Sequence, residues 1–158
     1  MSPAVNWNEE RAKEIVAPLA RVSGGLLPAL QAIQDEFGFV PKPAISLLAH
    51  MFNVTRAEVF GVASFYHDFR LDGPAGRHVL KLCRAEACQA VGADPLAAAA
   101  QAHLKVSWNE TKAGGEWTLE PVFCLGLCAS GPSAMIDGEP VARLDAEKLF
   151  ALLDEAER

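Results

Sequence analysis

The second half of the chain contains Val79-Leu80-Lys81-Leu82-Cys83-Arg84-Ala85-Glu86-Ala87-Cys88, a short apolar run that leads into a cysteine pair. Such a run, rich in Val and Leu, is typical of a buried strand, so Cys83 stands where the strand ends and the chain turns. A second pair, in Cys124-Leu125-Gly126-Leu127-Cys128, follows a predicted strand over residues 116–122. All four cysteines therefore lie in two close pairs, C-x4-C and C-x3-C, after predicted strands.

Paired cysteines of this kind can bind metal in more than one way. A [2Fe–2S] rhomb needs four thiolates, two for each iron, and one local pair can hold each iron. Structural zinc also takes four cysteines, although two residues usually separate its paired ligands. A thioredoxin-type redox pair would need C-x-x-C, which the sequence lacks. Spacing alone leaves the iron–sulfur and zinc interpretations open.

The first half of the chain is predicted to be helical. Apolar residues recur at helical spacing in three segments, residues 9–21, 26–37 and 41–52. Thr55 and Glu58 form a capping-box pattern, which predicts a fourth helix running to about Phe69. The aromatic residues of this helix are expected mainly to pack inside the helical domain, with contact to a partner subunit as the alternative: Phe60, Phe65, Tyr66 and Phe69.

The second half mixes strands and helices. The expected elements are a strand at 79–83, a helix at 94–104, two β-hairpins at 106–122 and 133–144, and a final helix after residue 145. Asp94 and Asp145 are the predicted N-caps of the two helices. The turn-rich run 71–76 predicts a boundary that gives domains over residues 1–73 and 74–158. The fold class is therefore α+β, a helical bundle followed by an α/β domain.

Composition excludes some functional classes. The net charge of −6 disfavours nucleic-acid binding, which requires clustered Lys and Arg. No apolar run approaches the roughly 18 residues of a membrane span, so no membrane insertion is expected. Residues 1–10 lack the basic flank and apolar stretch of a secretory signal, and a cytoplasmic location is expected. Thiols stay reduced there, which favours metal binding over disulfides.

The cysteine pattern as a whole, C-x4-C, 35 residues, then C-x3-C, resembles the thioredoxin-like [2Fe–2S] ferredoxin family, which includes the small iron–sulfur subunit of respiratory complex I. Residues 26–38 and 59–66 are similar to the helical N-terminal segment of that family, and the resemblance spans about residues 10–155. It implies a thioredoxin-like fold for residues 74–158. It also implies one [2Fe–2S] cluster with four ligands: Cys83, Cys88, Cys124 and Cys128.

Within the family, the loop 83–89 looks most like the gamma subunit of soluble NAD-dependent formate dehydrogenases. This likeness implies an electron-transfer subunit that exchanges single electrons with a flavin- and NAD(H)-binding subunit, beside a molybdenum-containing catalytic subunit. The alternatives are the equivalent subunit of a complex I-type NADH:quinone oxidoreductase or NAD-linked hydrogenase, and an assembly module with a structural cluster. The sequence has no phosphate-cradling glycine loop or dinucleotide fingerprint, and no catalytic site of its own is identified.

Two further sets of residues bear on the cluster. The histidines are interpreted as ordinary surface or core residues because four cysteines already complete a ligand set: His50, His67, His78 and His103. Arg84 lies inside the first cysteine loop, where its positive charge is expected to favour the reduced cluster, and Glu86 is expected to act in the opposite direction.

Overall fold

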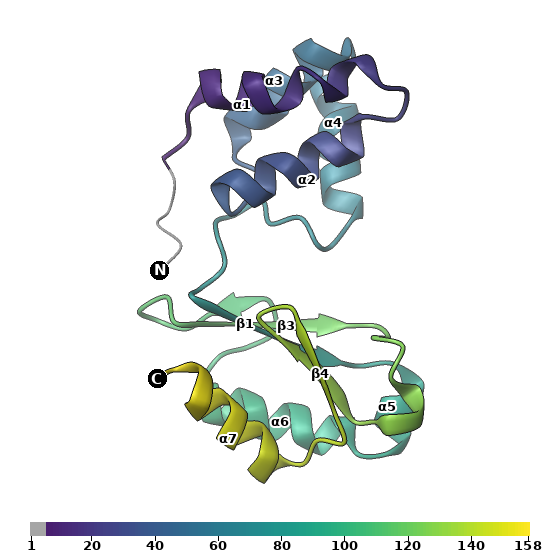
Figure 1. The fold of residues 1–158 in the computed structure, drawn as a ribbon, viewed down its shortest axis with the longest axis vertical. Coiled ribbons are helices and arrows are strands. Elements are labelled where there is room, and N and C mark those ends of the chain that lie inside the picture. Colours follow the sequence, from purple (N-terminus) through teal and green to yellow (C-terminus); the bar gives the residue numbers. More distant parts are fainter. Residues whose placement is uncertain (1–5) are drawn as a thin grey trace. The chain divides into compact units, whose positions relative to one another are not determined.

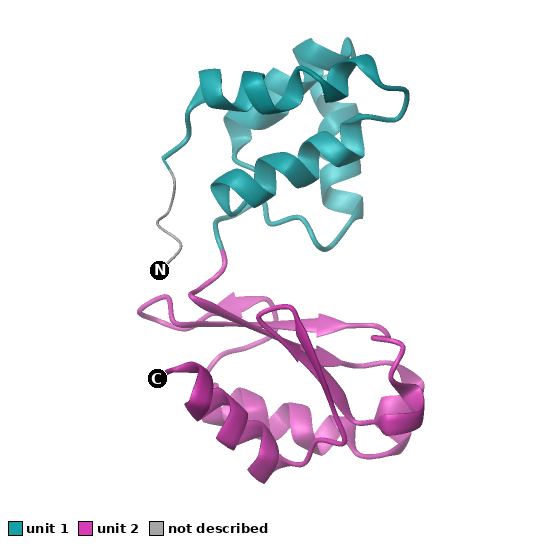
Figure 2. Cartoon of the chain, in the orientation of Figure 1, with its two compact units in different colours: residues 1–74 teal, residues 75–158 magenta. Residues whose placement is uncertain are grey.

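A computed structural model describes residues 6–158, so the first half of the stretch 1–10 lies outside the described residues. The chain divides into two compact units, Met1–Pro74 and Ala75–Arg158 (Figure 2). Helices and strands are present in the proportions of an α+β protein, which confirms the predicted fold class. No helix within residues 6–158 has both the length and the apolar character needed to span a bilayer.

The first unit consists of helices around one apolar core (Figure 1). Its elements are α1 (Glu9–Val16), a 3-10 turn η1 (Leu19–Arg21), α2 (Leu26–Phe37), α3 (Lys42–Phe52) and α4 (Arg56–Phe65). The largest fully buried side chains of this core come from α1, α2, α3 and the loop between α2 and α3: Val16, Leu30, Ile33, Phe37, Val40 and Leu48. The apolar stripes predicted from helical spacing thus face one another and form the core.

Two helices of this unit are shorter than predicted. The segment 9–21 does not form one helix, because α1 stops at Val16 and Pro18, which has no N–H group, cannot continue the hydrogen-bond ladder. Helix α4 ends at Phe65 rather than Phe69. Beyond it, the Gln34 side chain of α2 donates to the carbonyl of Asp68 at 2.8 Å and accepts from the N–H of Arg70 at 2.7 Å. These tertiary hydrogen bonds hold the chain in a non-helical path.

The aromatic residues of α4 and of the segment that follows it differ in burial. Phe69 is buried, but Phe60, Phe65 and Tyr66 are exposed, and Phe65 retains 73% of its accessible surface. The expectation that this series packs inside the helical unit is therefore wrong for three of its four members. The predicted capping box is confirmed, since Thr55 accepts from the Glu58 N–H at 3.2 Å and donates its own N–H to the Glu58 carboxylate at 2.7 Å.

The second unit is built on a five-stranded mixed sheet in the order β2-β3-β1-β4-β5 (Figure 1). The strands are β1 (His78–Cys83), β2 (Glu110–Thr111), β3 (Trp117–Val122), β4 (Ser133–Ile136) and β5 (Glu139–Ala142). Both predicted hairpins are present, β2 with β3 and β4 with β5. The central strand β1 runs parallel to β3 and antiparallel to β4.

The helices of this unit are α5 (Glu86–Ala90), α6 (Ala93–Leu104) and α7 (Ala146–Ala156). Helices α6 and α7 lie on the same face of the sheet and bury a core with it (Figure 1). Asp145 caps α7 as predicted, by accepting from the Lys148 N–H. The prediction for Asp94 is wrong: α6 begins at Ala93, because the chain turns at Gly92 between α5 and α6, and Asp94 lies in the first turn.

Candidate iron–sulfur site

The cysteines meet because two adjacent strands are parallel. Strands β1 and β3 pair in a register that sets Cys83 opposite Val122, and the Arg84 N–H extends the ladder to the Val122 carbonyl at 2.7 Å. The carboxyl ends of parallel neighbours lie at the same edge of a sheet, so the chain leaves β1 and β3 side by side. The first pair follows β1 into α5, and the second follows β3 into the 3-10 turn η2 (Cys128–Ser130).

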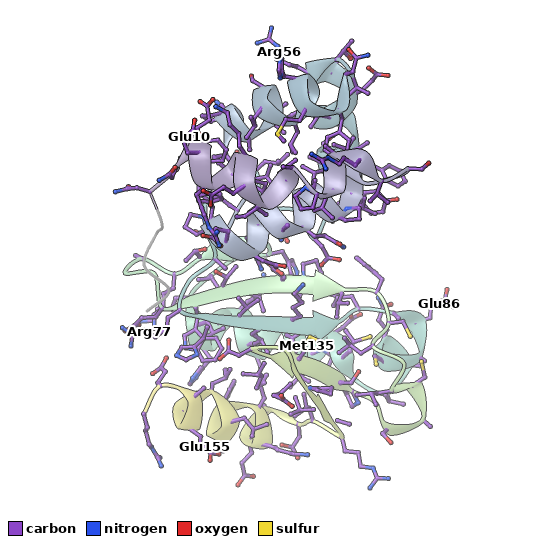
Figure 3. The ribbon with its side chains drawn as sticks, turned by 45° about the horizontal axis from the view of Figure 1, so that its top comes forward. Glu10, Arg56, Arg77, Glu86, Met135 and Glu155 are labelled. Atoms are coloured by element: carbon purple, nitrogen blue, oxygen red, sulfur yellow. The ribbon has the colours of Figure 1, made fainter. Side chains whose placement is uncertain are left out.

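The four thiols form one group at this edge. The Sγ atoms of Cys124 and Cys128 lie 3.6 Å apart. Two thiolates on one tetrahedral metal ion, with bonds of about 2.3 Å, are separated by about 3.8 Å, so this pair already has the spacing of two ligands on one ion. Cys88 contacts the Cys83 thiol, and the charges of Cys83 and Cys88 both act on Cys128. Figure 3 shows sulfur atoms gathered at the end of the sheet near Glu86.

Backbone N–H groups surround the innermost thiol. Burial acts to raise the pKa of the Cys83 thiol, but hydrogen bonds outweigh it and lower that pKa. The donors are the N–H of Ala85, the thiol of Cys88, and the N–H groups of Cys124 and Leu125. Each stabilises a thiolate, the form that binds metal. The pKa of Cys128 is raised, because its hydrogen bond with the Cys124 sulfur and repulsion from the charge of Cys124 both favour the protonated thiol.

The loop after β3 has an unusual backbone. Cys124 has φ +96°, which is rare for a residue with a side chain, and Gly126 has φ +77°. This conformation directs the Gly126 N–H to the Cys124 sulfur at 3.3 Å. A non-glycine residue held at such a φ is strained, and such strain concentrates at functional sites. The backbone conformation of this loop therefore places a hydrogen-bond donor, the Gly126 N–H, beside the Cys124 sulfur.

The two pairs differ in their access to solvent. Cys83 and Cys88 are buried, whereas Cys124 and Cys128 are exposed. Phe123, beside the exposed pair, keeps 74% of its surface. A group held by all four sulfurs would have one side in the protein interior and the other at the surface.

Sequence reasoning missed two residues that contact Cys88. Gly131 leaves room for the sulfur, since a Cβ at this position would lie 3.3 Å from Cys88 Sγ and 2.9 Å from the Val91 side chain. Ser133 is buried at the start of β4, and its hydroxyl oxygen lies 3.5 Å from Cys88 Sγ. The only local signal is that both flank Pro132 shortly after the second cysteine pair.

Charged and aromatic residues near the first loop also have defined partners. Arg84 pairs with Asp94 at 2.9 Å, and its guanidinium lies over the Trp108 ring, 5.2 Å from the centroid. The Arg84 Nε–H is buried and has no hydrogen-bond partner among the described residues.

Two of the histidines interact with residues other than the cysteines: His78 pairs with Asp137 at 2.6 Å, and His103 stacks on Phe150.

The donor set fits a two-iron cluster. A [2Fe–2S] rhomb takes two thiolates for each iron, and the site offers two local pairs whose sulfurs converge. The buried backbone donors and the space beside Gly131 suit sulfur atoms that carry negative charge.

Comparison with known proteins identifies the family. A family model described as thioredoxin-like [2Fe–2S] ferredoxin matches residues 12–157. The chain belongs to the thioredoxin-like [2Fe–2S] ferredoxin family. It accordingly carries one [2Fe–2S] cluster, as the resemblance of the cysteine pattern implied.

Two relatives in this ferredoxin family are subunits of larger NADH-quinone oxidoreductases. The E subunit of the NADH-quinone oxidoreductase of Escherichia coli (strain K12) is 36% identical over 129 residues, which cover 81% of this chain and 76% of that protein. The corresponding E 2 subunit from Rhizobium meliloti (strain 1021) is 34% identical over 145 residues, covering 90% of this chain and 86% of that protein.

A solved structure shares the fold. The air-oxidised NAD+-reducing [NiFe]-hydrogenase matches with a TM-score of 0.71 and 26% identity, covering 84% of this chain. This ferredoxin-family chain spans 23% of the length of that hydrogenase chain. The named proteins support the alternative parent complexes, NADH-quinone oxidoreductase or NAD-linked hydrogenase, better than the predicted formate dehydrogenase.

Proposed function

We propose that this protein is the [2Fe–2S] electron-transfer subunit of a cytoplasmic complex I-type NADH-oxidising assembly. Its ferredoxin domain corresponds to residues 74–158, and its helical domain to residues 1–73. Cluster ligation is assigned to Cys83, Cys88, Cys124 and Cys128, and a flavin- and NAD(H)-binding subunit is its redox partner. One observation carries the proposal: the ends of the parallel strands β1 and β3 bring two cysteine pairs into one group.

The residues around the site have separate tasks in this function. The bound cluster supplies one-electron redox chemistry. The buried pair Cys83 and Cys88 excludes water, and the backbone donors to Cys83 compensate negative charge. The exposed pair Cys124 and Cys128 provides the short path along which a redox partner exchanges electrons.

Metal and sulfide analysis tests the ligand assignment. We expect two irons and two acid-labile sulfides per chain, with a paramagnetic signal only after one-electron reduction. Replacing Cys88 with Ser should lower the iron content. One zinc per chain, or four irons, would contradict the assignment, as would a native cluster in the Cys88→Ser protein.

A second parent complex has support of its own. The fold match to the NAD+-reducing hydrogenase, over 84% of this chain, makes a hydrogenase assembly the second candidate. The formate dehydrogenase prediction, with its molybdenum subunit, rests on the loop 83–89 alone.

Purification of the intact complex from its source separates these parent complexes. An accompanying flavoprotein with NADH:quinone activity supports the first candidate. Nickel in the preparation would indicate a hydrogenase instead, and molybdenum would indicate a formate dehydrogenase.

A further inference from the structure

Ser133 is a buried hydroxyl beside one of the cysteines. Its oxygen lies 3.5 Å from Cys88 Sγ, only 2% of its surface is exposed, and 1% of Cys88 is exposed. Water therefore has little access to either group, and the hydroxyl depends on protein partners. The contact joins β4 to α5, and the two residues are separated by 45 positions along the chain.

We propose that Ser133 is a positioning and tuning residue, which donates a hydrogen bond to the Cys88 sulfur and raises the midpoint potential of the cluster. This inference rests on the proposed ligand set. In the free protein either atom can donate. A thiolate bound to iron has no proton, so in the loaded protein the hydroxyl must be the donor.

The direction of the effect follows from charge. An oxidised [2Fe–2S] core is formally +2, and four thiolates give the site a charge of −2, which becomes −3 on reduction. A donor aimed at one of these sulfurs is bound more strongly by the more negative state, because hydrogen bonds to charged acceptors are the stronger ones. Hydrogen bonds to sulfur are accordingly among the factors that set the potential of iron–sulfur clusters.

The Ser133 hydroxyl differs in kind from the other hydrogen-bond donors to the cysteine sulfurs. Cys83 receives several backbone donors and Cys124 one, all of which are present whatever side chains the loops carry. Ser133 differs because its donor is a side chain, held at the start of β4 by pairing with Ala142 of β5. A single substitution can thus remove this hydrogen bond and leave the backbone donors in place.

The test is a redox titration of the iron-loaded protein with three variants. Ser133→Ala removes the donor, Ser133→Thr keeps a hydroxyl, and Thr118→Val is the matched control. Thr118 is also a buried hydroxyl in the sheet, but it pairs with Val79, four residues before Cys83, and accepts from the Gly76 N–H. Iron content and circular dichroism are measured for each.

We expect Ser133→Ala to retain two irons while its ratio of reduced to oxidised cluster, at fixed potential, falls by about two- to tenfold; tenfold corresponds to 59 mV for one electron. Ser133→Thr and Thr118→Val should stay near the native ratio. An unchanged ratio in Ser133→Ala overturns the inference, and so does an equal fall in Thr118→Val.

If Ser133→Ala does not fold, Ser133→Val replaces it under the same criterion, because Val has the shape of the Thr variant without its hydroxyl and favours a strand. Loss of the cluster from both variants would assign Ser133 a structural role only and would likewise overturn the inference. Failure of the proposed function is a different result, because it appears as missing iron in the native protein.

Discussion

Arg84 shows how one residue's effect depends on a neighbour that is distant in sequence. Its place between Cys83 and Cys88 predicts a positive charge near the cluster. The structure adds Asp94, whose carboxylate lies 2.9 Å from the guanidinium. The two charges act on the cluster with opposite signs, so the pair affects the potential less than Arg84 would alone.

We expect Arg84→Gln to lower the midpoint potential and Asp94→Asn to raise it. At about 7 Å, a unit charge and the added electron interact by roughly 0.6 kcal/mol at the dielectric of water and 2.4 kcal/mol at an effective value of 20, which gives about 25 to 100 mV. Asp94 is the more exposed partner, so its shift should be the smaller. Redox titrations at low and high salt measure both.

The double variant is the control for this prediction. Because Arg84→Gln and Asp94→Asn remove charges of opposite sign, the potential of the double variant should fall between that of Arg84→Gln and that of the native protein. Shifts below about 10 mV in both single variants would show that these charges do not tune the cluster.

At the scale of the element, the start of α4 is the best-defined local structure in the helical unit. Thr55 and Glu58 satisfy two backbone donors that would otherwise lack partners in the first turn. This arrangement needs no tertiary contact, which is why the sequence pattern predicts it. Where α4 ends depends instead on Gln34 of another helix.

Replacing Thr55 with Ala should destabilise the helical unit by about 1 kcal/mol, because the Glu58 N–H loses its cap. Urea unfolding followed by circular dichroism measures the change. Asn8→Ala, at the cap of α1, is the comparable substitution, since Asn8 accepts from the Arg11 N–H in the same way. No loss of stability in either variant would contradict the role assigned to side-chain caps in this unit.

The same cap predicts a pH dependence. Hydrogen bonds from the Thr55 N–H and hydroxyl lower the pKa of Glu58 below its ordinary value of 4.5. The carboxylate therefore stabilises the folded chain above that ordinary value, and the contribution is lost as the pH falls through the lowered pKa. Glu58→Gln should be less stable than the native protein at pH 7, and the difference should shrink below pH 4.5 in urea titrations. A difference that grows on acidification would contradict the assignment.

At the scale of the whole molecule, the core of the first unit and the buried cysteines are separate. The helical unit has an apolar core of its own, and the buried cysteines lie in a small cluster of the second unit with Ala93. A change at the cysteines should therefore leave the helical core intact.

We expect Cys128→Ser to lose much of its iron while the helical signal of the first unit persists, because that unit contains no cysteine. Iron analysis and circular dichroism on the same sample measure both effects. Ser130→Ala, in the same 3-10 turn, is the control and should keep a full cluster. Collapse of helicity in Cys128→Ser would show that the two units depend on each other for folding.

Local patterns determined much of this protein. The strand before each cysteine pair, the capping box of α4, the cap of α7 and the two hairpins depend on residues within a few positions of one another, where turn chemistry and periodicity act. The spacing within each pair likewise indicates metal binding. Asp94 is the counterexample. Its local pattern predicts an N-cap, but the turn at Gly92 between α5 and α6 starts the helix earlier and places Asp94 in the first turn.

Only the tertiary structure decided how distant segments combine. The parallel pairing of β1 with β3 brings Cys83 and Cys124 together across 40 intervening residues, and no local signal specifies that pairing. The same holds for Ser133 beside Cys88, Asp94 beside Arg84 and the exposure of Phe65. Each results from packing between elements, which is set by the burial of the whole core rather than by neighbours in sequence.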